Sequence, residues 1–358
     1  MIVTDLRICD FRNLGLVHLE PNERFNILEG RNGQGKTNIL EAIYVLGSLK
    51  SFRATVSREM IRFDCSQTDI RGVVSHAGNE RVVRISIGER GRKVSIDGKS
   101  TRSLSDSLGQ LTVVLFAPED LALSKGSPSQ RRRFIDRAVF NRWPASWGDM
   151  KRYEAALKQR NALLKQDASD DMLDAFDDQL AQAGGQVLEW RQKYLDLFAP
   201  LFTESLLEMS GGELDGRISY DSKLEQLDAP GLMKAFQQNR YKDRARRATS
   251  VGPHIDDLMT TFNGQSTRSY ASQGQHRAFV LAMKIAEIRL LKEGLGQSPV
   301  LLLDDVSSEL DAERNAQLME YLCSDAFGGQ VFLTTTDRSY VRIDSENSCF
   351  KICNGEIV

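Results

Sequence analysis

The chain has 358 residues, of which 41% are hydrophobic and 27% charged, and its formal net charge is −2. That length suggests one large domain or two lobes, and the composition is typical of a globular protein with a sizeable core. No apolar stretch reaches the roughly 18 residues of a membrane-spanning helix, and no basic region followed by an apolar run opens the chain. We therefore expect a cytoplasmic protein without a membrane partner. The near-neutral charge neither supports nor excludes a nucleic-acid partner, because a local basic patch is sufficient.

The first 118 residues read as strands around one helix. Residues 3–8 and 17–19 predict a hairpin, and the apolar run 25–28, ended by Gly30, predicts a buried strand. A helix is expected over 39–49. The alternating pattern within 70–117, with the turn signal Asp97-Gly98, predicts antiparallel sheet.

The pattern becomes helical after Pro118. Apolar residues recur in steps of three and four over 150–164 and 173–201, and the polar stretch 167–171 between them reads as a turn. This predicts a short antiparallel helical hairpin. After residue 252 the α/β pattern returns, with buried strands at 300–303 and 330–333. We expect a discontinuous α/β lobe, 1–118 and 253–358, interrupted by a mainly helical lobe, 119–252.

Charge is unevenly spread within the helical lobe. Residues 131–160 carry nine Lys or Arg and three Asp or Glu, whereas residues 165–189 carry one Lys and seven Asp or Glu. These are either two solvated helix faces, or the basic stretch contacts a polyanion. In the second case Arg131, Arg132 and Arg133 are candidate DNA contacts. A separate alternative for these three arginines is that they pair with carboxylates inside the lobe, for which Asp136 is a possible partner.

A phosphate-binding motif lies between the strand 25–28 and the following helix. It fits G-x-x-x-x-G-K-[ST] and consists of Gly30, Arg31, Asn32, Gly33, Gln34, Gly35, Lys36 and Thr37. Backbone N–H groups of such a loop surround phosphate oxygens, and the helix N-terminus adds a positive dipole end. Lys36 can reach the β- and γ-phosphates, and the Thr37 hydroxyl can ligate Mg²⁺. The predicted cofactors are therefore ATP and Mg²⁺.

Two carboxylates end the apolar strand 300–303. Strand burial does not explain Asp304 and Asp305, since an unpaired buried charge is costly, but a nearby cation does. We expect Asp304 to hold Mg²⁺, directly or through water. We expect Asp305 to orient and activate the attacking water.

The order of the remaining motifs points to one class of ATPase. Alone, Ser272-Gln273-Gly274-Gln275 reads as the start of a helix over 277–291. After a phosphate loop and before Leu303-Asp304-Asp305, it matches an ABC-type head. In that class a Ser-Gly helix N-terminus of one subunit caps the γ-phosphate held by the other, a role that falls on Ser272, Gly274 and Gln275. Residues 308–311, including Asp311, occupy the D-loop position. Thr334, Thr335 and Thr336 occupy the switch position after the final strand, with Thr336 as the candidate catalytic residue.

Several further segments are specific in composition and order: F-R-N at 11–13, N-G-Q-G-K-T-N at 32–38, P-E-D-L at 118–121, G-S-P at 126–128, R-R-R-F-I-D at 131–136, G-P-H at 252–254, D-D-L at 256–258, S-Q-G-Q-H-R at 272–277 and L-D-D-V at 303–306. They span nearly the whole chain and together resemble the RecF family of bacterial DNA-repair ATPases. One departure from the family is Ile255, where its members usually have Arg or Lys. A departure from the wider ABC-type class is the lack of a clear glutamine loop.

The resemblance implies a fold and a function. The fold is an α/β, SMC-like, ABC-type P-loop ATPase head with an antiparallel β subdomain and an inserted helical lobe. RecF-like proteins bind ATP, dimerise on duplex or gapped DNA near the nucleoid and, with RecR and RecO, help load RecA onto single-strand gaps. Their slow, DNA-dependent hydrolysis acts as a switch tied to release. The alternatives are a transporter ATP-binding subunit, an SMC-type structural protein, and a P-loop protein that does not contact DNA.

Overall fold

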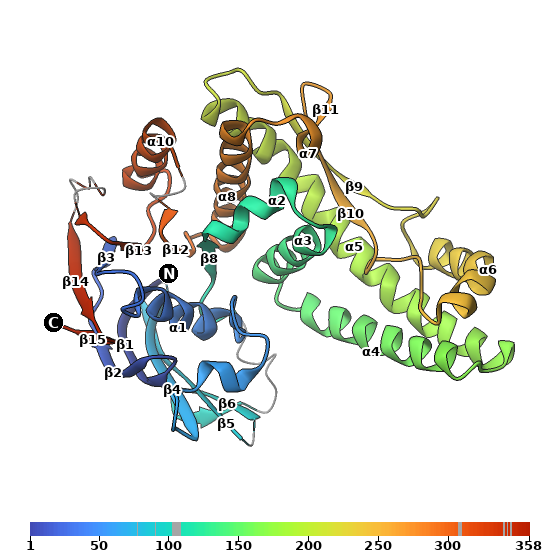
Figure 1. Ribbon diagram of the computed structural model, residues 1–358, viewed down its shortest axis with the longest axis horizontal. Coiled ribbons are helices and arrows are strands. Elements are labelled where there is room, and N and C mark those ends of the chain that lie inside the picture. Colours follow the sequence, from blue (N-terminus) through green and yellow to red (C-terminus); the bar gives the residue numbers. More distant parts are fainter. Residues whose placement is uncertain are drawn as a thin grey trace. The chain divides into compact units, whose positions relative to one another are not determined.

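The computed structural model describes residues 1–76, 78–89, 91–101, 109–306, 310–338, 341, 343 and 346–358. Contacts within the described chain form two units, here called the α/β unit, Met1–Asp120 with Glu287–Val358, and the helical unit, Leu121–Ala286 (Figure 1). The first boundary lies two residues beyond the predicted one. The second lies well after the predicted residue 252, because a small sheet built from residues 216–266 groups with the helices.

One sheet of the α/β unit is antiparallel, in the order β2-β1-β4-β5-β6-β7. Its strands are β1 Ile2–Phe11, β2 Leu14–Leu19, β4 Gln67–His76, β5 Asn79–Gly88, β6 Gly91–Ile96 and β7 Lys99–Ser100. The predicted opening hairpin and the turn at 97–98 are both confirmed. Asp97 and Gly98 have φ of 51° and 78°, as a two-residue hairpin turn between paired Ile96 and Lys99 requires.

The second sheet of this unit is mainly parallel, in the order β15-β14-β3-β13-β12-β8. Its strands are β3 Phe25–Glu29, β8 Val113–Phe116, β12 Val300–Leu303, β13 Val331–Thr335, β14 Asn347–Cys353 and β15 Glu356–Ile357. The prediction that residues 70–117 form antiparallel sheet throughout is wrong for β8, which pairs in parallel with β12. All four β8 residues are buried, as in a strand covered on both faces, rather than alternating.

Two described helices of the α/β unit each follow one of the predicted motifs. Helix α1, Lys36–Ser48, follows the phosphate motif, and α10, Ala312–Cys323, follows the strand-end carboxylates. Short 3₁₀ turns occupy Ser57–Met60 and Pro118–Leu121. Since β3, β12 and β13 are parallel neighbours, their carboxyl ends share one edge of the sheet, where such sheets bind ligands.

The helical unit contains the predicted hairpin and more. Its helices are α2 Ala122–Lys125, α3 Pro128–Arg142, α4 Ser146–Lys165, α5 Asp170–Met209, α6 Ala229–Arg246, α7 Thr267–Tyr270 and the first part of α8 Gln273–Leu295. Helices α4 and α5 run antiparallel around the turn at 166–169. Helix α6, which the sequence did not single out, packs Leu232 and Phe236 into the core of this hairpin. An added Cβ at Gly184 of α5 would lie 2.7 Å from Cδ1 of Leu232, so the Leu232 side chain would have to shift to admit a larger residue.

A three-stranded antiparallel sheet completes the helical unit. It consists of β9 Gly216–Asp221, β10 Asp257–Phe262 and β11 Gln265–Ser266. Among the described residues, no helix is both long enough and apolar enough to cross a lipid bilayer.

Candidate nucleotide-binding site

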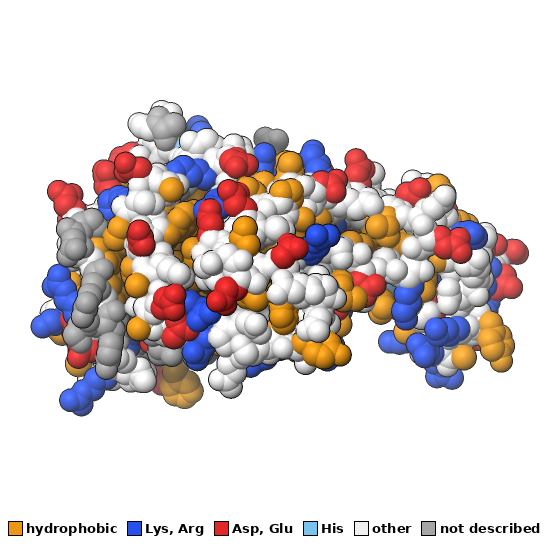
Figure 2. Space-filling view, turned by 90° about the horizontal axis from the view of Figure 1, so that it is seen from above, with side chains coloured by type: hydrophobic (Ala, Val, Ile, Leu, Met, Phe, Trp, Pro, Cys, Tyr) orange, Lys and Arg blue, Asp and Glu red, His pale blue; other side chains and the backbone are white. Residues whose placement is uncertain are grey.

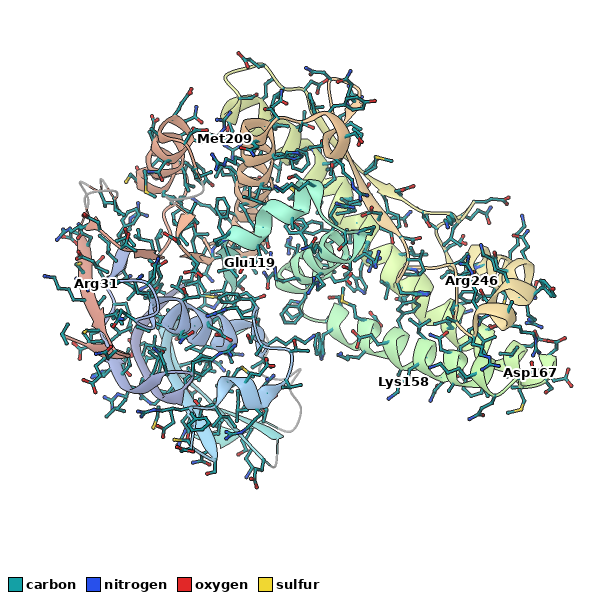
Figure 3. The ribbon with its side chains drawn as sticks, in the orientation of Figure 1. Arg31, Glu119, Lys158, Asp167, Met209 and Arg246 are labelled. Atoms are coloured by element: carbon teal, nitrogen blue, oxygen red, sulfur yellow. The ribbon has the colours of Figure 1, made fainter. Side chains whose placement is uncertain are left out.

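The phosphate motif forms a loop between β3 and α1. Gly33 and Gly35 have φ of 80° and 112°, in the left-handed region that glycine adopts without strain. Gly35 is the N-cap of α1 and provides no side-chain hydrogen bond. The positive end of the helix therefore lacks a competing cap, as an anion site needs. Arg31 is exposed on this loop (Figure 3).

The chain after β14 holds the loop in place. The backbone N–H of Gly355 donates to the carbonyl of Gln34 at 2.9 Å, and the N–H of Asn354 donates to the Gln34 side-chain oxygen at 2.6 Å. An added Cβ at Gly30 would lie 2.4 Å from the carbonyl oxygen of Ile352. Gly30 is thus required by close packing against β14.

Lys36 lies within the loop that it is expected to serve. Its ammonium donates to the carbonyl oxygens of Gly30 at 2.5 Å and Arg31 at 2.9 Å. Burial lowers the pKa of Lys36, whereas the nearby negative charges of Asp305 and Asp304 act in the opposite direction. The ammonium of Lys36 can exchange these two carbonyl oxygens for phosphate oxygens.

Asp304 lies at the carboxyl end of β12, beside the start of α1. Its Oδ1 accepts hydrogen bonds from the hydroxyls of Thr37 at 2.8 Å and Thr334 at 3.0 Å. Burial raises the pKa of Asp304, and the negative charge of Glu119 adds to the effect. Carboxylate and hydroxyl oxygens are donors that Mg²⁺ prefers. A buried carboxylate in an acidic environment fits a cation, so these residues fit Mg²⁺.

Asp305 follows in a constrained conformation. Its φ is 50°, in the left-handed region that Asp tolerates better than most residues, and its N–H donates to the Thr334 hydroxyl at 2.8 Å. Thr334 therefore orients both carboxylate residues. The structure brings the predicted set of Lys36, Thr37, Asp304 and Asp305 to one edge of the sheet.

The predicted switch residue Thr336 is not part of this hydrogen-bonded set. It is exposed after the end of β13, two residues beyond Thr334. Thr334, predicted only as part of the switch position 334–336, contacts both Asp304 and Asp305. Glu119 is a member of the site to which the sequence assigned no role. Thr334 lies near the end of a buried strand and Glu119 belongs to the P-E-D segment. Neither observation predicts which residues lie next to these side chains in the folded chain.

The F-R-N segment at 11–13 contacts α1, the helix that follows the phosphate loop. The guanidinium of Arg12 donates to both oxygens of Glu41 at 3.0 and 2.7 Å, and Glu41 is fully buried in α1. Asn13 accepts a hydrogen bond from Asn38 at 2.7 Å. The sequence marked Arg12 and Asn13 as part of a specific segment but predicted no role for them. The structure gives them one, since both contact the first helix after the phosphate loop.

Ser272 begins α8 in the helical unit. Its hydroxyl accepts from the N–H of Gln275 at 3.2 Å, and the Gln275 side chain accepts from the N–H of Ser272 at 2.8 Å. This reciprocal pair is a capping box. Ser272 is exposed and Gly274 is half-buried, so the predicted motif does form a helix N-terminus that a ligand can approach.

Of the D-loop residues, Ser308 and Glu309 lie outside the described part of the chain. Asp311 is the N-cap of α10, where its Oδ1 accepts from the N–H of Arg314 at 3.0 Å. Its role in nucleotide binding stays a prediction.

The three arginines at 131–133 lie on α3 in different environments. Arg131 is 3% exposed, and its guanidinium donates to both oxygens of Asp257 at 2.7 Å. Arg132 donates to the backbone carbonyls of Ile255 and Asp256, and Arg133 is exposed. Internal pairing therefore holds for Arg131, although its partner is Asp257; Asp136 instead pairs with Arg191 at 2.8 Å.

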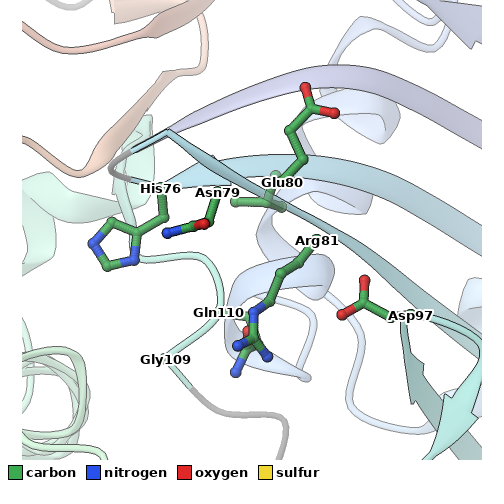
Figure 4. A pocket seen from close by; sticks show the side chains of 8 residues that line it. His76, Asn79, Glu80, Arg81, Asp97, Gly109 and Gln110 are labelled. Atoms are coloured by element: carbon green, nitrogen blue, oxygen red, sulfur yellow. The ribbon is translucent and has the colours of Figure 1, made fainter.

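A separate hollow of about 470 Å³ lies at the end of the β4–β5 hairpin (Figure 4). Its lining is polar and includes His76, Asn79, Glu80, Arg81 and Asp97. No residue of the phosphate loop lines it, so it is distinct from the nucleotide site.

Comparisons with known proteins agree with this geometry. The family model "RecF/RecN/SMC N terminal domain" matches residues 2–355. A "DNA replication and repair protein RecF" from Myxococcus xanthus is 43% identical over 350 residues, covering 94% of this chain and 91% of the relative. One of the same name from Geobacter metallireducens is 38% identical, covering 100% and 99%.

Solved structures give the same result. A structure of the recombination mediator protein RecF-ATP in the RecFOR pathway has a TM-score of 0.90 and 32% identity, covering 99% of this chain and 96% of that one. An Smc head bound to the C-terminal winged-helix domain of ScpA has a TM-score of 0.57 at 16% identity, with 100% and 97% covered, and is similar in fold alone. The family model covers nearly the whole chain, RecF relatives are about 40% identical over its length, and the chain shares their ABC-type head. The chain therefore belongs to the RecF family.

Proposed function

We propose that this protein is an ATP-controlled DNA-binding protein of DNA replication and repair. In this proposal two copies close around two ATP molecules on duplex or gapped DNA and, with RecO and RecR, help load RecA onto single-strand gaps. The observation that carries it is the hydrogen-bonded cluster of Thr37, Asp304 and Thr334 beside the Lys36 loop. The names of the relatives and of the RecF-ATP structure support the repair context.

The site residues divide the work on ATP. The ammonium of Lys36 leaves the carbonyls of Gly30 and Arg31 and binds the β- and γ-phosphates. Thr37 and Asp304 would hold Mg²⁺, which when bound neutralises phosphate charge. Asp305 holds the attacking water and accepts its proton, and its constrained backbone limits the directions in which the carboxylate can point.

The closing contact on the γ-phosphate is assigned to a second copy. At the N-terminus of α8 the N–H groups of Ser272 and Gln275 donate within the capping box. The N–H groups of Gln273 and Gly274, together with the positive dipole end of the helix, are what this terminus offers to an anion. ATP then contacts both copies, whereas ADP lacks the phosphate that reaches the second. Slow hydrolysis removes the shared ligand and releases the DNA, so the enzyme acts as a switch rather than as a metabolic catalyst.

An SMC-type structural protein is the runner-up, and the length of the helical hairpin argues against it. Helix α5 has 40 residues, about 60 Å, which is a short arm rather than a long coiled coil. The Smc head that resembles this chain does so at 16% identity, against 43% for a RecF relative.

Sedimentation of the protein with ATP or ADP, each with and without a gapped duplex, tests the proposal. We expect a dimer with ATP, a more stable dimer with ATP and DNA, and a monomer with ADP. A monomer under all four conditions, in a protein that binds ATP, would contradict it. Lys36→Ala, which removes the phosphate-binding cation, serves as the control that stays monomeric with ATP.

A further inference from the structure

A histidine and two carboxylates lie together on the β1–β2 hairpin of the α/β unit (Figure 1). We call them the hairpin triad; they are Asp5 of β1, His18 of β2 and Glu20, which directly follows β2. One imidazole nitrogen and one oxygen of each carboxylate lie within 4.8 Å of one another. Within the part of the chain that the structure describes, this is the one such group of three histidine, cysteine or carboxylate side chains. The predicted Mg²⁺ site at Thr37 and Asp304 includes none of them.

The strand register places the three side chains on the outer face of the antiparallel sheet. His18 and Glu20 are two residues apart and both exposed, whereas Leu19 between them is buried, as the alternation of a strand requires. On β1 the buried Leu6 follows Asp5, so Asp5 points away from the core as well. Because Leu6 pairs with Leu19, Asp5 lies beside Glu20 at the open end of the hairpin.

A β-bulge lies immediately before Asp5. Val3 pairs with Val74 of β4, and Asp5 pairs with Val73, so Thr4 is the extra residue on β1. Bulges of this kind bend a strand and re-aim its side chains, and they are frequent beside functional sites. The bulge is a feature of the backbone, separate from the three side chains, at the place where they meet.

The distances within the hairpin triad suit a metal ion that forms short bonds. Nε2 of His18 lies 2.7 Å from Oδ2 of Asp5. A metal about 2.0–2.1 Å from each ligand, at tetrahedral or octahedral angles, holds neighbouring donor atoms roughly 3.0–3.4 Å apart. The two atoms therefore separate by less than about 1 Å when a metal replaces the proton between them. A carboxylate oxygen of Glu20 lies near both.

Two arginines contact the other carboxylate oxygen of Asp5. Arg71 donates to Oδ1 at 2.7 Å, and the guanidinium of Arg7 lies 3.5 Å from the same atom. Oδ2 is therefore held on the side of His18, as when an outer hydrogen bond fixes the orientation of a metal ligand. The two positive charges also oppose a bound cation. The side chain of Arg7 is 57% exposed and that of Arg71 36%, so Arg7 can be replaced with less effect on the sheet.

Surface charge alone does not single out this part of the molecule. Figure 2 shows acidic and basic side chains interspersed over the face of the α/β unit that it presents. The hairpin triad differs from such charges by its imidazole, a ligand that suits Zn²⁺, Fe²⁺ and Ni²⁺ better than Mg²⁺ or Ca²⁺. One imidazole together with two carboxylates therefore favours a divalent first-row transition metal.

We propose that the hairpin triad binds a divalent transition-metal ion such as Zn²⁺ through Nε2 of His18, Oδ2 of Asp5 and one carboxylate oxygen of Glu20. The bound ion cross-links β1 and β2 at the end of the hairpin opposite its turn. Since β2 is the outermost strand of its sheet, the cross-link holds an edge strand in place. This site is separate from the proposed ATP and DNA functions, because it needs neither nucleotide nor a second copy.

Isothermal titration with Zn²⁺, without nucleotide or Mg²⁺, tests this inference. We expect Zn²⁺ to bind roughly tenfold or more weakly to His18→Gln and to Glu20→Gln, since each variant lacks one ligand. Arg7→Gln should bind Zn²⁺ more tightly than wild type, because an opposing charge is removed. His76→Gln replaces an exposed histidine at the end of β4 and is the matched control that binds as wild type.

The absorption of bound Co²⁺ identifies the ligand atoms. Cysteine thiolate is a soft ligand that adds an intense charge-transfer band, whereas nitrogen and oxygen ligands give only weak visible bands. We expect the weak bands alone in wild type and their loss in His18→Gln. A thiolate band that survives in His18→Gln would place the metal on a cysteine and overturn the inference. Equal Zn²⁺ affinity in wild type, His18→Gln and Glu20→Gln would also overturn it, leaving an ordinary network of surface ion pairs.

Discussion

Asp304 and Asp305 are adjacent residues with different surroundings, and we expect substitutions at the two positions to affect different steps. Asp304 is bound by two hydroxyls beside the phosphate loop, so Asp304→Asn should weaken Mg²⁺-dependent ATP binding. Asp305→Asn should bind Mg²⁺–ATP normally and slow hydrolysis by about a hundredfold or more, because the attacking water loses its carboxylate. Titration with a fluorescent ATP analogue and single-turnover hydrolysis separate the two steps. Identical defects in both variants would reject this division of labour.

His254 makes the helical unit sensitive to acid. Its Nε2 donates to the carbonyl of Thr249 at 3.1 Å, and its Nδ1 accepts from the hydroxyl of Tyr153 at 2.6 Å. Burial lowers the pKa of His254, and the positive charges of Arg132 and Arg191 add to this, while the Thr249 contact and Asp243 oppose it. The unfolded chain therefore binds a proton more readily than the folded one. The stability contribution is present above about pH 6.5 and is lost as pH falls below that value.

Urea unfolding at pH 7.5 and 5.5 checks this prediction. All three tryptophans, Trp143, Trp147 and Trp190, belong to the helical unit, so tryptophan fluorescence reports its unfolding. We expect wild type to be less stable at pH 5.5 than at pH 7.5, because the unfolded chain takes up the proton that the buried imidazole does not. His254→Gln should be less stable at pH 7.5 and should change less with pH. A steeper pH dependence in His254→Gln would contradict the neutral histidine.

At the scale of elements, Arg131 joins α3 to β10, and its neighbour Arg133 does not. Arg131→Gln leaves Asp257 without its guanidinium and should cost the helical unit on the order of 3 kcal/mol. Arg133→Gln should leave stability unchanged. If Arg133 contacts DNA, that substitution lowers the salt slope of duplex binding by about 0.9. Thermal unfolding together with anisotropy at several salt concentrations measures both. Full stability in Arg131→Gln would show that the ion pair does not hold α3.

Sequence patterns predicted the elements that depend mainly on residues close together in the chain. The phosphate loop, the strands at 25–28 and 300–303 and the α4–α5 hairpin follow from glycine spacing and apolar periodicity. Helix α6 was missed because its apolar residues are few and much of its anchoring is ionic, through Asp243 and Arg244. The pairing of β8 with β12 joins segments far apart in sequence, so no local signal determines it. Thr334 was passed over for Thr336 for a similar reason: only the register between β12 and β13 brings it to Asp304.

For the whole molecule, a nucleotide site shared between copies predicts complementation between two inactive variants. Ser272→Arg should leave ATP binding by the monomer intact and block dimerisation, since the added cation meets the Lys36 loop of the opposing copy. Lys36→Ala should not bind ATP tightly. In a mixed dimer one site carries both defects and the other is wild type. Partial recovery of ATP hydrolysis on mixing is the expected result, and full hydrolysis by Ser272→Arg as a monomer would refute the shared site.

The contacts of Gln34 also order events during synthesis of the chain. Gln34 is made early, but the Asn354 N–H that holds it lies 320 residues later. At about 5–20 residues per second, the loop waits roughly 15–60 s for that contact. Strands β13 and β14, the neighbours of β3, are also among the last segments made. The phosphate loop therefore gains these two hydrogen bonds only after Asn354 and Gly355 have been made.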